Sequence, residues 1–336
     1  MNDLSIRKDR QAGRITFTRP KALNALSHDM ARAIHKALDD WRDDPDVKLV
    51  IIDAEGEKAF CAGGDVAAVY HAAREGDHST GQEFFADEYR MNAALADYSK
   101  PIVAFMQGFV MGGGVGVGGH AAHRVVGDTT QIAMPETLIG LVPDVGGSWL
   151  LAHAPGRIGE YLGLTGARMG AGDAIHAGFA DHYVPEAEWS ALIDQIAESG
   201  DLSALKSRHA PHPTLADRDL SAFGGRTVAD ILRALEANGD AETLGALRKM
   251  SPLSLAVTLQ IVRAARGDSR MQESLSREYR YTSRATQMTD FLEGVRAQVI
   301  DKDRSPHWSY DGSAENVAAV TSGLGKSELV WPDAAA

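Results

Sequence analysis

Short apolar runs in the first third of the chain have the pattern of buried β-strands. Residues 49–52 (Leu-Val-Ile-Ile) and residues 101–106 (Pro-Ile-Val-Ala-Phe-Met) are continuously apolar and have polar neighbours. Apolar runs of this length without alternation are typical of buried strands. Residues 13–18 alternate enough to predict a further short strand. We therefore expect strands at these three places, with the one at 49–52 covered on both faces.

Other segments carry apolar residues three or four positions apart, which is the spacing of one helix face. The first such segment follows Ser27, a residue suited to cap a helix N-terminus. Its apolar face consists of Met30, Ile34, Leu38 and Trp41. We expect this face to belong to the hydrophobic core.

A second apolar face contains an acidic residue. After residue 81 the chain places Phe84, Met91, Leu95 and Tyr98 at helical spacing, and Glu88 falls within the same face. An unpaired buried carboxylate is costly, so one interpretation puts Glu88 at the edge of the face, reaching water or a cation. The other interpretation is an acid directed inward at a site. The spacing alone leaves both open.

Two junctions between a strand and a run of glycines are the most distinctive feature of the chain. One contains Gly63 and Gly64 after residues 58–62, and the other spans residues 111–119 after the strand at 101–106. Glycine has no Cβ, so its backbone amide can approach a ligand closely. A helix that begins in such a run directs unpaired N–H groups outward. Two junctions could thus supply two amides to one oxygen, although close helix packing is the simpler alternative.

Two carboxylates follow the second junction within about thirty residues. Glu136 comes directly after Pro135, and Asp144 directly after Pro143. Pro-Glu in a first helical turn can merely compensate the helix dipole, and residues 143–147 can be a simple turn. The alternative is acid chemistry beside an oxygen that backbone amides hold.

Composition narrows the class of protein. The chain has 336 residues and a net charge of −12, which argues against a nucleic-acid binder. No apolar run is long enough to predict a membrane span. A single cysteine, Cys61, excludes an internal disulfide and fits a reducing compartment, so we expect the cytoplasm. His120 and His123 have no third ligand nearby, so we expect no metal site.

The second half of the chain is mostly helical in pattern. Residues 209–213 are polar and contain two prolines, so they are the best candidate for a domain boundary. We expect a core domain at 1–208 and a mainly helical region at 209–336 that covers the site. Its predicted helices are 228–237, 253–265, 271–285 and 288–301.

Several motifs in order resemble the crotonase (enoyl-CoA hydratase/isomerase) superfamily. The resemblance spans about residues 15–308, and its motifs are residues 19–26, 60–65, 111–116, 134–147, 291–297 and 300–306. The last three are most similar to the 3-hydroxyisobutyryl-CoA hydrolases within that superfamily. The resemblance implies an α/β fold in which repeated ββα units form a spiral of sheets, with a helical C-terminal region.

The resemblance also implies a CoA thioester substrate. Its carbonyl oxygen would lie between the amides of Gly64 and Gly113, which match the two glycine junctions. The positions that match the CoA-binding residues of the family are Lys21, Ala22, Ala62, Gly64, Asp65 and Val66. No metal or redox cofactor is implied, and no macromolecular partner except a homo-oligomer.

One departure from the hydratases bears on the reaction. Hydratases carry two acids, and here Gly116 stands at the first position and Glu136 at the second. One carboxylate beside an oxyanion hole suits thioester cleavage, with Glu136 as nucleophile or general base. The hydrolase pattern adds Asp144 to position water or the substrate hydroxyl, and Glu88 to contact the substrate.

The resemblance thus implies hydrolysis of a short branched 3-hydroxyacyl-CoA, such as 3-hydroxyisobutyryl-CoA in valine breakdown. Two alternatives stay open. One is an enoyl-CoA hydratase or isomerase of the same superfamily. The other is a catalytically weak acyl-CoA-binding protein in which Glu136 is only structural.

Overall fold

A computed structural model describes residues 3–331, and their contacts divide them into two compact units. Unit 1 comprises the chain up to Asp65, Arg90–Ala133 and Arg168–Arg218. Unit 2 comprises Val66–Tyr89, Met134–Ala167 and the chain from Asp219 onward. Each unit is built from separated stretches of sequence. The sequence predicted one domain boundary, between residues 208 and 209. That boundary stays a prediction.

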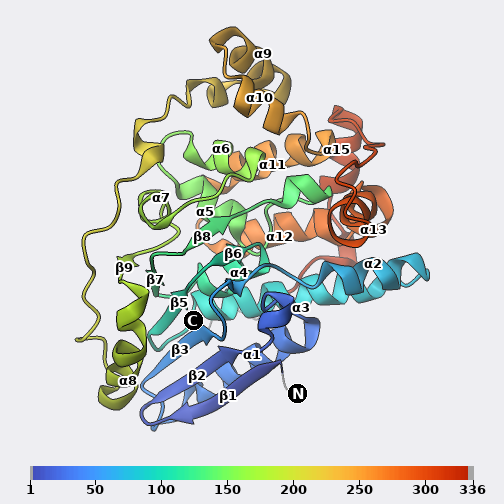
Figure 1. Ribbon diagram of the computed structural model, residues 1–336. Helices are drawn as coiled ribbons and strands as arrows, with labels where there is room; N and C mark the ends of the chain where they lie inside the picture. The colour runs from blue at the N-terminus through green and yellow to red at the C-terminus, as the bar shows by residue number, and fades with distance from the viewer. Residues whose placement is uncertain (1–2, 332–336) are drawn as a thin grey trace. The chain divides into compact units, whose positions relative to one another are not determined.

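Unit 1 contains two sheets of mainly parallel strands (Figure 1). The six-stranded sheet has the order β1-β2-β3-β5-β7-β9, with strands at Leu4–Asp9, Ala12–Phe17, Leu49–Ala54, Ile102–Met106, His123–Val126 and His182–Tyr183. The three-stranded sheet has the order β4-β6-β8, with strands at Ala59–Cys61, Phe109–Met111 and Gln131–Ala133. Among these nine strands of the described residues, β1 and β2 pair antiparallel and the other neighbouring strands pair in parallel. The strands predicted from the apolar runs are confirmed.

The chain alternates between the two sheets, which gives the predicted spiral. β3, β5 and β7 each enter the larger sheet, and the strand that follows each of them enters the smaller one. Each turn therefore adds one parallel strand to both sheets. The α/β spiral of repeated units that the resemblance implied is thus confirmed.

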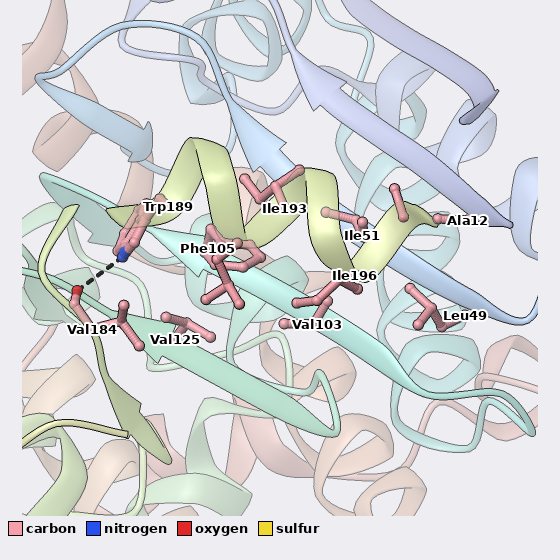
Figure 2. Close-up of a cluster of buried hydrophobic side chains, with 12 residues drawn as sticks. Ala12, Leu49, Ile51, Val103, Phe105, Val125, Val184, Trp189, Ile193 and Ile196 are labelled. Atoms are coloured by element: carbon pink, nitrogen blue, oxygen red, sulfur yellow. Dashed lines mark hydrogen bonds between the residues drawn. The ribbon is translucent and has the colours of Figure 1, made fainter. Parts of the chain in front are cut away.

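One face of the larger sheet packs against helix α8, Trp189–Ser199 (Figure 2). Trp189 lies edge-on to Phe105 with ring centroids 5.4 Å apart, and its indole N–H donates to the Val184 carbonyl oxygen at 2.9 Å. Ile193 and Ile196 continue the contact along the helix. The hydrogen bond lets the polar end of a buried tryptophan stay satisfied within an apolar core.

Unit 1 also contains the first predicted helix, α1, at His28–Arg42. The Ser27 hydroxyl accepts from the Met30 amide at 3.3 Å, as expected of an N-cap, and the four predicted apolar residues are buried. The remaining short helices of this unit are η1 (Pro20–Ala22), α4 (Gly113–Gly118), α7 (Ala171–His176), η3 (Glu186–Glu188) and η4 (Thr214–Asp217).

The secondary-structure elements assigned to the described residues of unit 2 are all helices, joined by turns and loops. Its helices outside the C-terminal region are α2 (Val66–Arg74), the first part of α3 (Ser79–Ala96), η2 (Glu136–Ile139), α5 (Gly147–His153) and α6 (Ile158–Thr165). The C-terminal region adds η5 (Ser221–Gly224), α9 (Val228–Asn238), α10 (Ala241–Leu247), α11 (Pro252–Ala265), α12 (Met271–Thr282), α13 (Ala285–Met288), α14 (Phe291–Val295), η6 (Arg296–Ile300), α15 (Ala314–Thr321) and η7 (Gly325–Ser327). Among the residues that the structure describes, no helix is long and apolar enough to cross a membrane.

Two of the four predicted C-terminal helices are wrong in their bounds. The helix expected at 271–285 ends at Thr282, and the one expected at 288–301 is α14 followed by the π-helical turn η6. The Asp290 carboxylate accepts from the amides of Ser309 and Tyr310, at 2.8 and 3.1 Å, just before α14 begins. These hydrogen bonds fix the backbone at Asp290 in a conformation that interrupts the expected helix. The local spacing of apolar residues gives no information about such bonds to residues 309 and 310.

The two glycine junctions approach each other so closely that a side chain on Gly114 has no room. A Cβ built on Gly114 would collide with the Cys61 carbonyl oxygen, whereas one on Gly245 in helix α10 meets open space. We predict that Gly114→Ala lowers the free energy of unfolding by at least about 1–3 kcal/mol through overpacking. Gly245→Ala, the matched control, should raise it by roughly 0.5–1 kcal/mol. Urea unfolding of both variants tests this, and a Gly114→Ala protein as stable as the wild type would contradict the close approach.

Candidate active site

The two predicted oxyanion glycines lie at neighbouring strand ends in unit 1. β4 pairs in parallel with β6, so the chain after Cys61 and the chain after Met111 leave the smaller sheet side by side. Gly113 is the first residue of α4, and a helix's first amides have no partner inside the helix. Gly64 forms a parallel bridge with Leu26 in which the bonded groups are the Gly63 carbonyl and the Asp65 amide. The Gly64 N–H is therefore outside that bridge.

The predicted CoA-binding residues lie around the first junction. Lys21 and Ala22 form the exposed turn η1, and the amide of Ala62 donates to the Leu23 carbonyl oxygen at 3.0 Å. The Asp65 carboxylate accepts from Arg19 at 3.4 Å. Val66, the last predicted residue, begins α2 and belongs to unit 2. Their contacts with CoA stay a prediction.

Unit 2 contains four buried carboxylates that influence one another. The three predicted acids, Glu88, Glu136 and Asp144, are 2%, 5% and 3% exposed, and Glu278 is 0% exposed. Within residues 3–331 none of the four forms a salt bridge. We call Glu88, Glu136, Asp144 and Glu278 the carboxylate cluster. Burying acids together without a cation is unfavourable, so the arrangement needs a reason other than stability.

Asp144 is the member with the clearest hydrogen-bond partner. The Tyr89 hydroxyl donates to Asp144 Oδ2 at 2.7 Å and lies 3.1 Å from Thr282 Oγ1. Burial raises the pKa of Asp144, the Tyr89 hydrogen bond opposes this, and the result is a pKa of about 7. Asp144 therefore changes its charge near neutral pH.

The turn after Asp144 has an unusual backbone. Val145 and Gly146 have φ angles of 55° and 78°, in the left-handed region. For a β-branched residue such as Val145 this costs on the order of 1–3 kcal/mol and persists only where surrounding contacts impose it. Glu278 supplies such contacts, because it accepts from the Gly146 amide at 2.9 Å, from the Ser148 amide at 3.0 Å and from the Ser148 hydroxyl.

Glu136 lies at the start of η2, directly after a buried strand-to-turn segment. The Thr137 carbonyl oxygen accepts from the Ser251 amide at 3.1 Å. The Thr137 hydroxyl donates to the Leu164 carbonyl oxygen at 3.3 Å. These bonds anchor the turn that presents Glu136. Burial, and then the negative charge of Asp144, raises the pKa of Glu136 well above its usual value.

Glu88 projects from α3 into the same cluster. Its pKa is raised well above the usual value by burial and then by the charge of Asp144. One carboxylate oxygen of Glu88 and one of Glu136 have no hydrogen-bond partner within the described residues. The interpretation that Glu88 reaches water or a cation at the edge of the helix face is therefore wrong, because the side chain is buried. That Glu88 contacts a substrate stays a prediction.

This arrangement is able to move protons near neutral pH. A carboxyl group with a raised pKa is a stronger base when ionised, and a general base works best with a pKa close to the working pH. Because the acids interact, their protons leave in steps that belong to the cluster and not to single residues. The unpartnered oxygens of Glu88 and Glu136 leave acceptor sites for a bound molecule or water.

Sequence reasoning missed four residues of this site, namely Tyr89, Ser148, Glu278 and Thr282. Glu278 gave the same signal as Glu88, because it lies at helical spacing with the buried residues Met271, Leu275 and Thr282. The presence of an acidic residue on an apolar helix face could therefore have identified Glu278 as a candidate site residue. His120 and His123 belong to no metal-binding group, since none of three or more suitable side chains exists within residues 3–331.

Comparison with known proteins defines the class. A family model described as enoyl-CoA hydratase/isomerase matches residues 12–322. The chain therefore belongs to the enoyl-CoA hydratase/isomerase family. Several curated relatives carry one more specific name, 3-hydroxyisobutyryl-CoA hydrolase. The Gallus gallus protein of that name, described as mitochondrial, is 39% identical over 91% of this chain and 84% of its own length. The Arabidopsis thaliana 3-hydroxyisobutyryl-CoA hydrolase 1 is 39% identical over 88% of this chain and 83% of its own.

Solved structures carry other names. The crystal structure of an enoyl-CoA hydratase from Rhodobacter sphaeroides 2.4.1 is 54% identical, with a TM-score of 0.94 over 98% of this chain and 100% of that chain. A carnitinyl-CoA dehydratase from Mycobacterium thermoresistibile is 38% identical, with a TM-score of 0.92 over 98% and 99%. The fold is thus settled as that of the crotonases, and the relatives' names divide between hydrolysis and hydration.

The raised pKa of Glu88 has a consequence for stability. Between the ordinary pKa and the raised one, the folded protein binds more protons than the unfolded chain, so this group's contribution falls as pH rises. Glu88→Gln removes the group. We therefore predict that the melting temperature of the variant, relative to that of the wild type, increases as the pH rises above the ordinary pKa of a glutamate.

Glu160→Gln is the matched control. Glu160 is also 0% exposed in unit 2, but Arg157, Arg263 and Arg266 surround it. Burial would raise its pKa, but hydrogen bonds from Arg266 and Arg157 lower it overall. Its stabilisation is fully present above the ordinary pKa and is lost in acid, so above about pH 5 this variant should be less stable than the wild type by an amount that does not change with pH. Parallel melting curves of the two variants against pH would contradict the assignment of the Glu88 pKa.

Proposed function

We propose that the protein hydrolyses the thioester of a short branched 3-hydroxyacyl-CoA, most specifically 3-hydroxyisobutyryl-CoA to 3-hydroxyisobutyrate and CoA. The observation that carries the proposal is the group of Glu136, Asp144 and Glu88, buried together with unpartnered carboxylate oxygens. The names of the curated relatives support the same substrate.

The proposed reaction begins at the thioester carbonyl. Glu136 either removes a proton from water, whose oxygen attacks the carbonyl carbon, or attacks that carbon itself to give an acyl–enzyme anhydride. The negative charge that develops on the carbonyl oxygen would be stabilised by the amides of Gly64 and Gly113, and losing one such donor typically costs about 3–4 kcal/mol. The C–S bond then breaks, and the CoA thiolate leaves and takes up a proton. In the anhydride route, water hydrolyses the intermediate afterwards.

The other acids have supporting roles in this proposal. Asp144, fixed by the Tyr89 hydroxyl, positions the attacking water or the substrate hydroxyl. Glu88, kept protonated by its raised pKa, donates a hydrogen bond to the substrate. Lys21, Ala22, Ala62, Gly64, Asp65 and Val66 hold the CoA portion. The proposed reaction requires no metal or redox cofactor.

Hydration is the second candidate, because the Rhodobacter sphaeroides structure carries that name at 54% identity. Hydration of an enoyl double bond uses two acids on one water in the hydratases that this chain resembles. Gly116, within α4, stands where the first of those acids belongs. The single acid at Glu136 therefore favours hydrolysis.

We further propose that the protein acts in valine breakdown in the cytoplasm. The single cysteine, Cys61, fits a reducing compartment. The vertebrate relatives are described as mitochondrial, so the organelle is the competing location. A homo-oligomer fits the family resemblance. Antibody staining of the source cells and sedimentation of the purified protein test these two points.

Substrate preference tests the role given to Glu88 and Asp144. We predict that 3-hydroxyisobutyryl-CoA is cleaved with a kcat/KM at least roughly 10²-fold above that of isobutyryl-CoA. A site that hydrogen-bonds a substrate hydroxyl discriminates strongly against the analogue without it. Thiol release from both compounds measures this, and equal kcat/KM values would remove the hydroxyl from the recognition.

The identity of the reaction is tested at Glu136. Glu136→Gln preserves shape but removes charge and basicity, so hydrolysis should fall by at least roughly 10²–10⁴-fold. Binding of CoA should change little, because the amides and CoA contacts remain. The wild type should hydrate crotonyl-CoA slowly, and Gly116→Glu should damage hydrolysis by filling space beside the acyl group.

Thiol release and loss of enoyl absorbance, followed in parallel for the three proteins, separate the candidates. Rapid loss of crotonyl-CoA by the wild type without thiol release from 3-hydroxyisobutyryl-CoA would replace hydrolysis by hydration. Binding without either reaction would leave a catalytically weak acyl-CoA-binding protein.

A further inference from the structure

The fourth member of the carboxylate cluster, Glu278, takes no part in the bond-making and bond-breaking steps of the proposed reaction. Glu278 is 0% exposed and comes from α12, about 130 residues after the turn that it contacts. A buried carboxylate without a cation is unfavourable unless several donors satisfy it. Glu278 has three, all from the chain between Gly146 and Ser148.

These three bonds act on the segment that follows Asp144. Gly146 is the N-cap of α5 and has no side chain, so it cannot cap the helix itself. Glu278 takes the place of a capping side chain by accepting from the amides of Gly146 and Ser148. These bonds stabilise the turn in which Val145 and Gly146 have left-handed backbone conformations. The direction in which Asp144 leaves the chain depends on that conformation.

The same helix also reaches Asp144 from a second side. Thr282 lies four residues after Glu278, so both project from one face of α12. Thr282 Oγ1 is 3.1 Å from the Tyr89 hydroxyl, which donates to Asp144. One helix face therefore contacts both the turn that carries Asp144 and the tyrosine that binds it.

We propose that Glu278 is a positioning residue for Asp144 and Glu136, acting through its bonds to the 146–148 backbone and through its negative charge. This inference rests on the proposed function, since it concerns the activity of that same site. Glu278 itself touches no substrate in this proposal. It is distinct from the three acids that the family resemblance implied.

The negative charge of Glu278 also affects the pKa of Glu136, which a residue with a purely structural role would not do. Its burial, opposed by the Ser148 hydroxyl and the Gly146 amide, gives Glu278 a pKa of about 7. When ionised, it raises the pKa of Glu136. The other ionisable groups facing the cluster are Glu88 and Tyr89 from α3, and Asp144. On α12 itself, Arg277 and Arg280 pair elsewhere, with Asp268 and Glu328.

The test compares Glu278→Gln with Glu160→Gln, the same substitution at another fully buried acid of unit 2. In Glu278→Gln an amide NH₂ faces a backbone N–H, so the turn loses one partner, and the negative charge is lost. We expect kcat for 3-hydroxyisobutyryl-CoA to fall roughly 10–10²-fold with little change in KM, as expected of misplaced catalytic groups. We also expect the acid limb of the kcat/KM profile to move to lower pH, because Glu136 loses a negative neighbour.

Glu160→Gln should lower the melting temperature but leave the acid limb where it is. If Glu278→Gln does not fold, Ser148→Ala replaces it. This milder change removes one hydrogen-bond donor to Glu278, so Glu278 stays protonated over a wider pH range. The acid limb of the kcat/KM profile should therefore move to lower pH, but by less than in Glu278→Gln. An acid limb unmoved in the folded variant would overturn the positioning role, whatever happens to kcat. Loss of hydrolysis in the wild type itself would instead contradict the proposed function.

Discussion

The burial of several acids in one helical unit without a cation is the constraint on which the site depends. Glu88, Glu136, Asp144 and Glu278 are at most 5% exposed, and burial together with the negative charge of Asp144 raises the pKa values of the other three. Desolvation and mutual repulsion both disfavour ionisation, so the acids retain protons at pH values where exposed acids lose them. The surrounding structure offsets this with a small number of donors: a tyrosine hydroxyl, a serine hydroxyl and two backbone amides. A chain under selection for stability alone would replace such a cluster with apolar residues.

The two units supply different kinds of chemistry. Unit 1 offers backbone amides at two glycine junctions, which the pairing of β4 and β6 places at neighbouring strand ends. Amides do not titrate, so their contribution to stabilising an oxyanion is constant over the working pH range. Unit 2 offers groups that do titrate, with Asp144 and Glu278 near pH 7. The proposed thioester hydrolysis uses both kinds of group.

The parts of the fold that could be predicted from the sequence depend on local pattern. The buried strand β3 and the helix α1 follow from apolar runs and helical spacing, because their neighbours in sequence decide their environment. Helix α10 was missed, since it is only 7 residues long and contains Gly245. The break before α14 was missed because the Asp290 bonds to residues 309 and 310 join segments about twenty residues apart.

The residues of the candidate site also divide into those that local sequence patterns predict and those that they do not. Glu136 and Asp144 sit in motifs that resemble a known family, and Glu88 lies on an apolar helix face, so all three could be found. Glu278 acts by accepting from backbone amides more than a hundred residues away, and a backbone amide leaves no trace in the sequence. Its place on the apolar face of α12 was the one local sign.

The most direct test of this account is to observe the protonated acids themselves. Infrared difference spectra of the wild type and of Asp144→Asn, recorded across pH, report the carbonyl stretch of protonated carboxyl groups. We expect such groups to persist at neutral pH in the wild type, and Asp144 and Glu278 to lose their protons near about pH 7. Asp144→Asn should remove one of these two steps. A wild-type spectrum without any protonated carboxyl group above about pH 6, where exposed acids are fully ionised, would contradict the carboxylate cluster as the source of the chemistry.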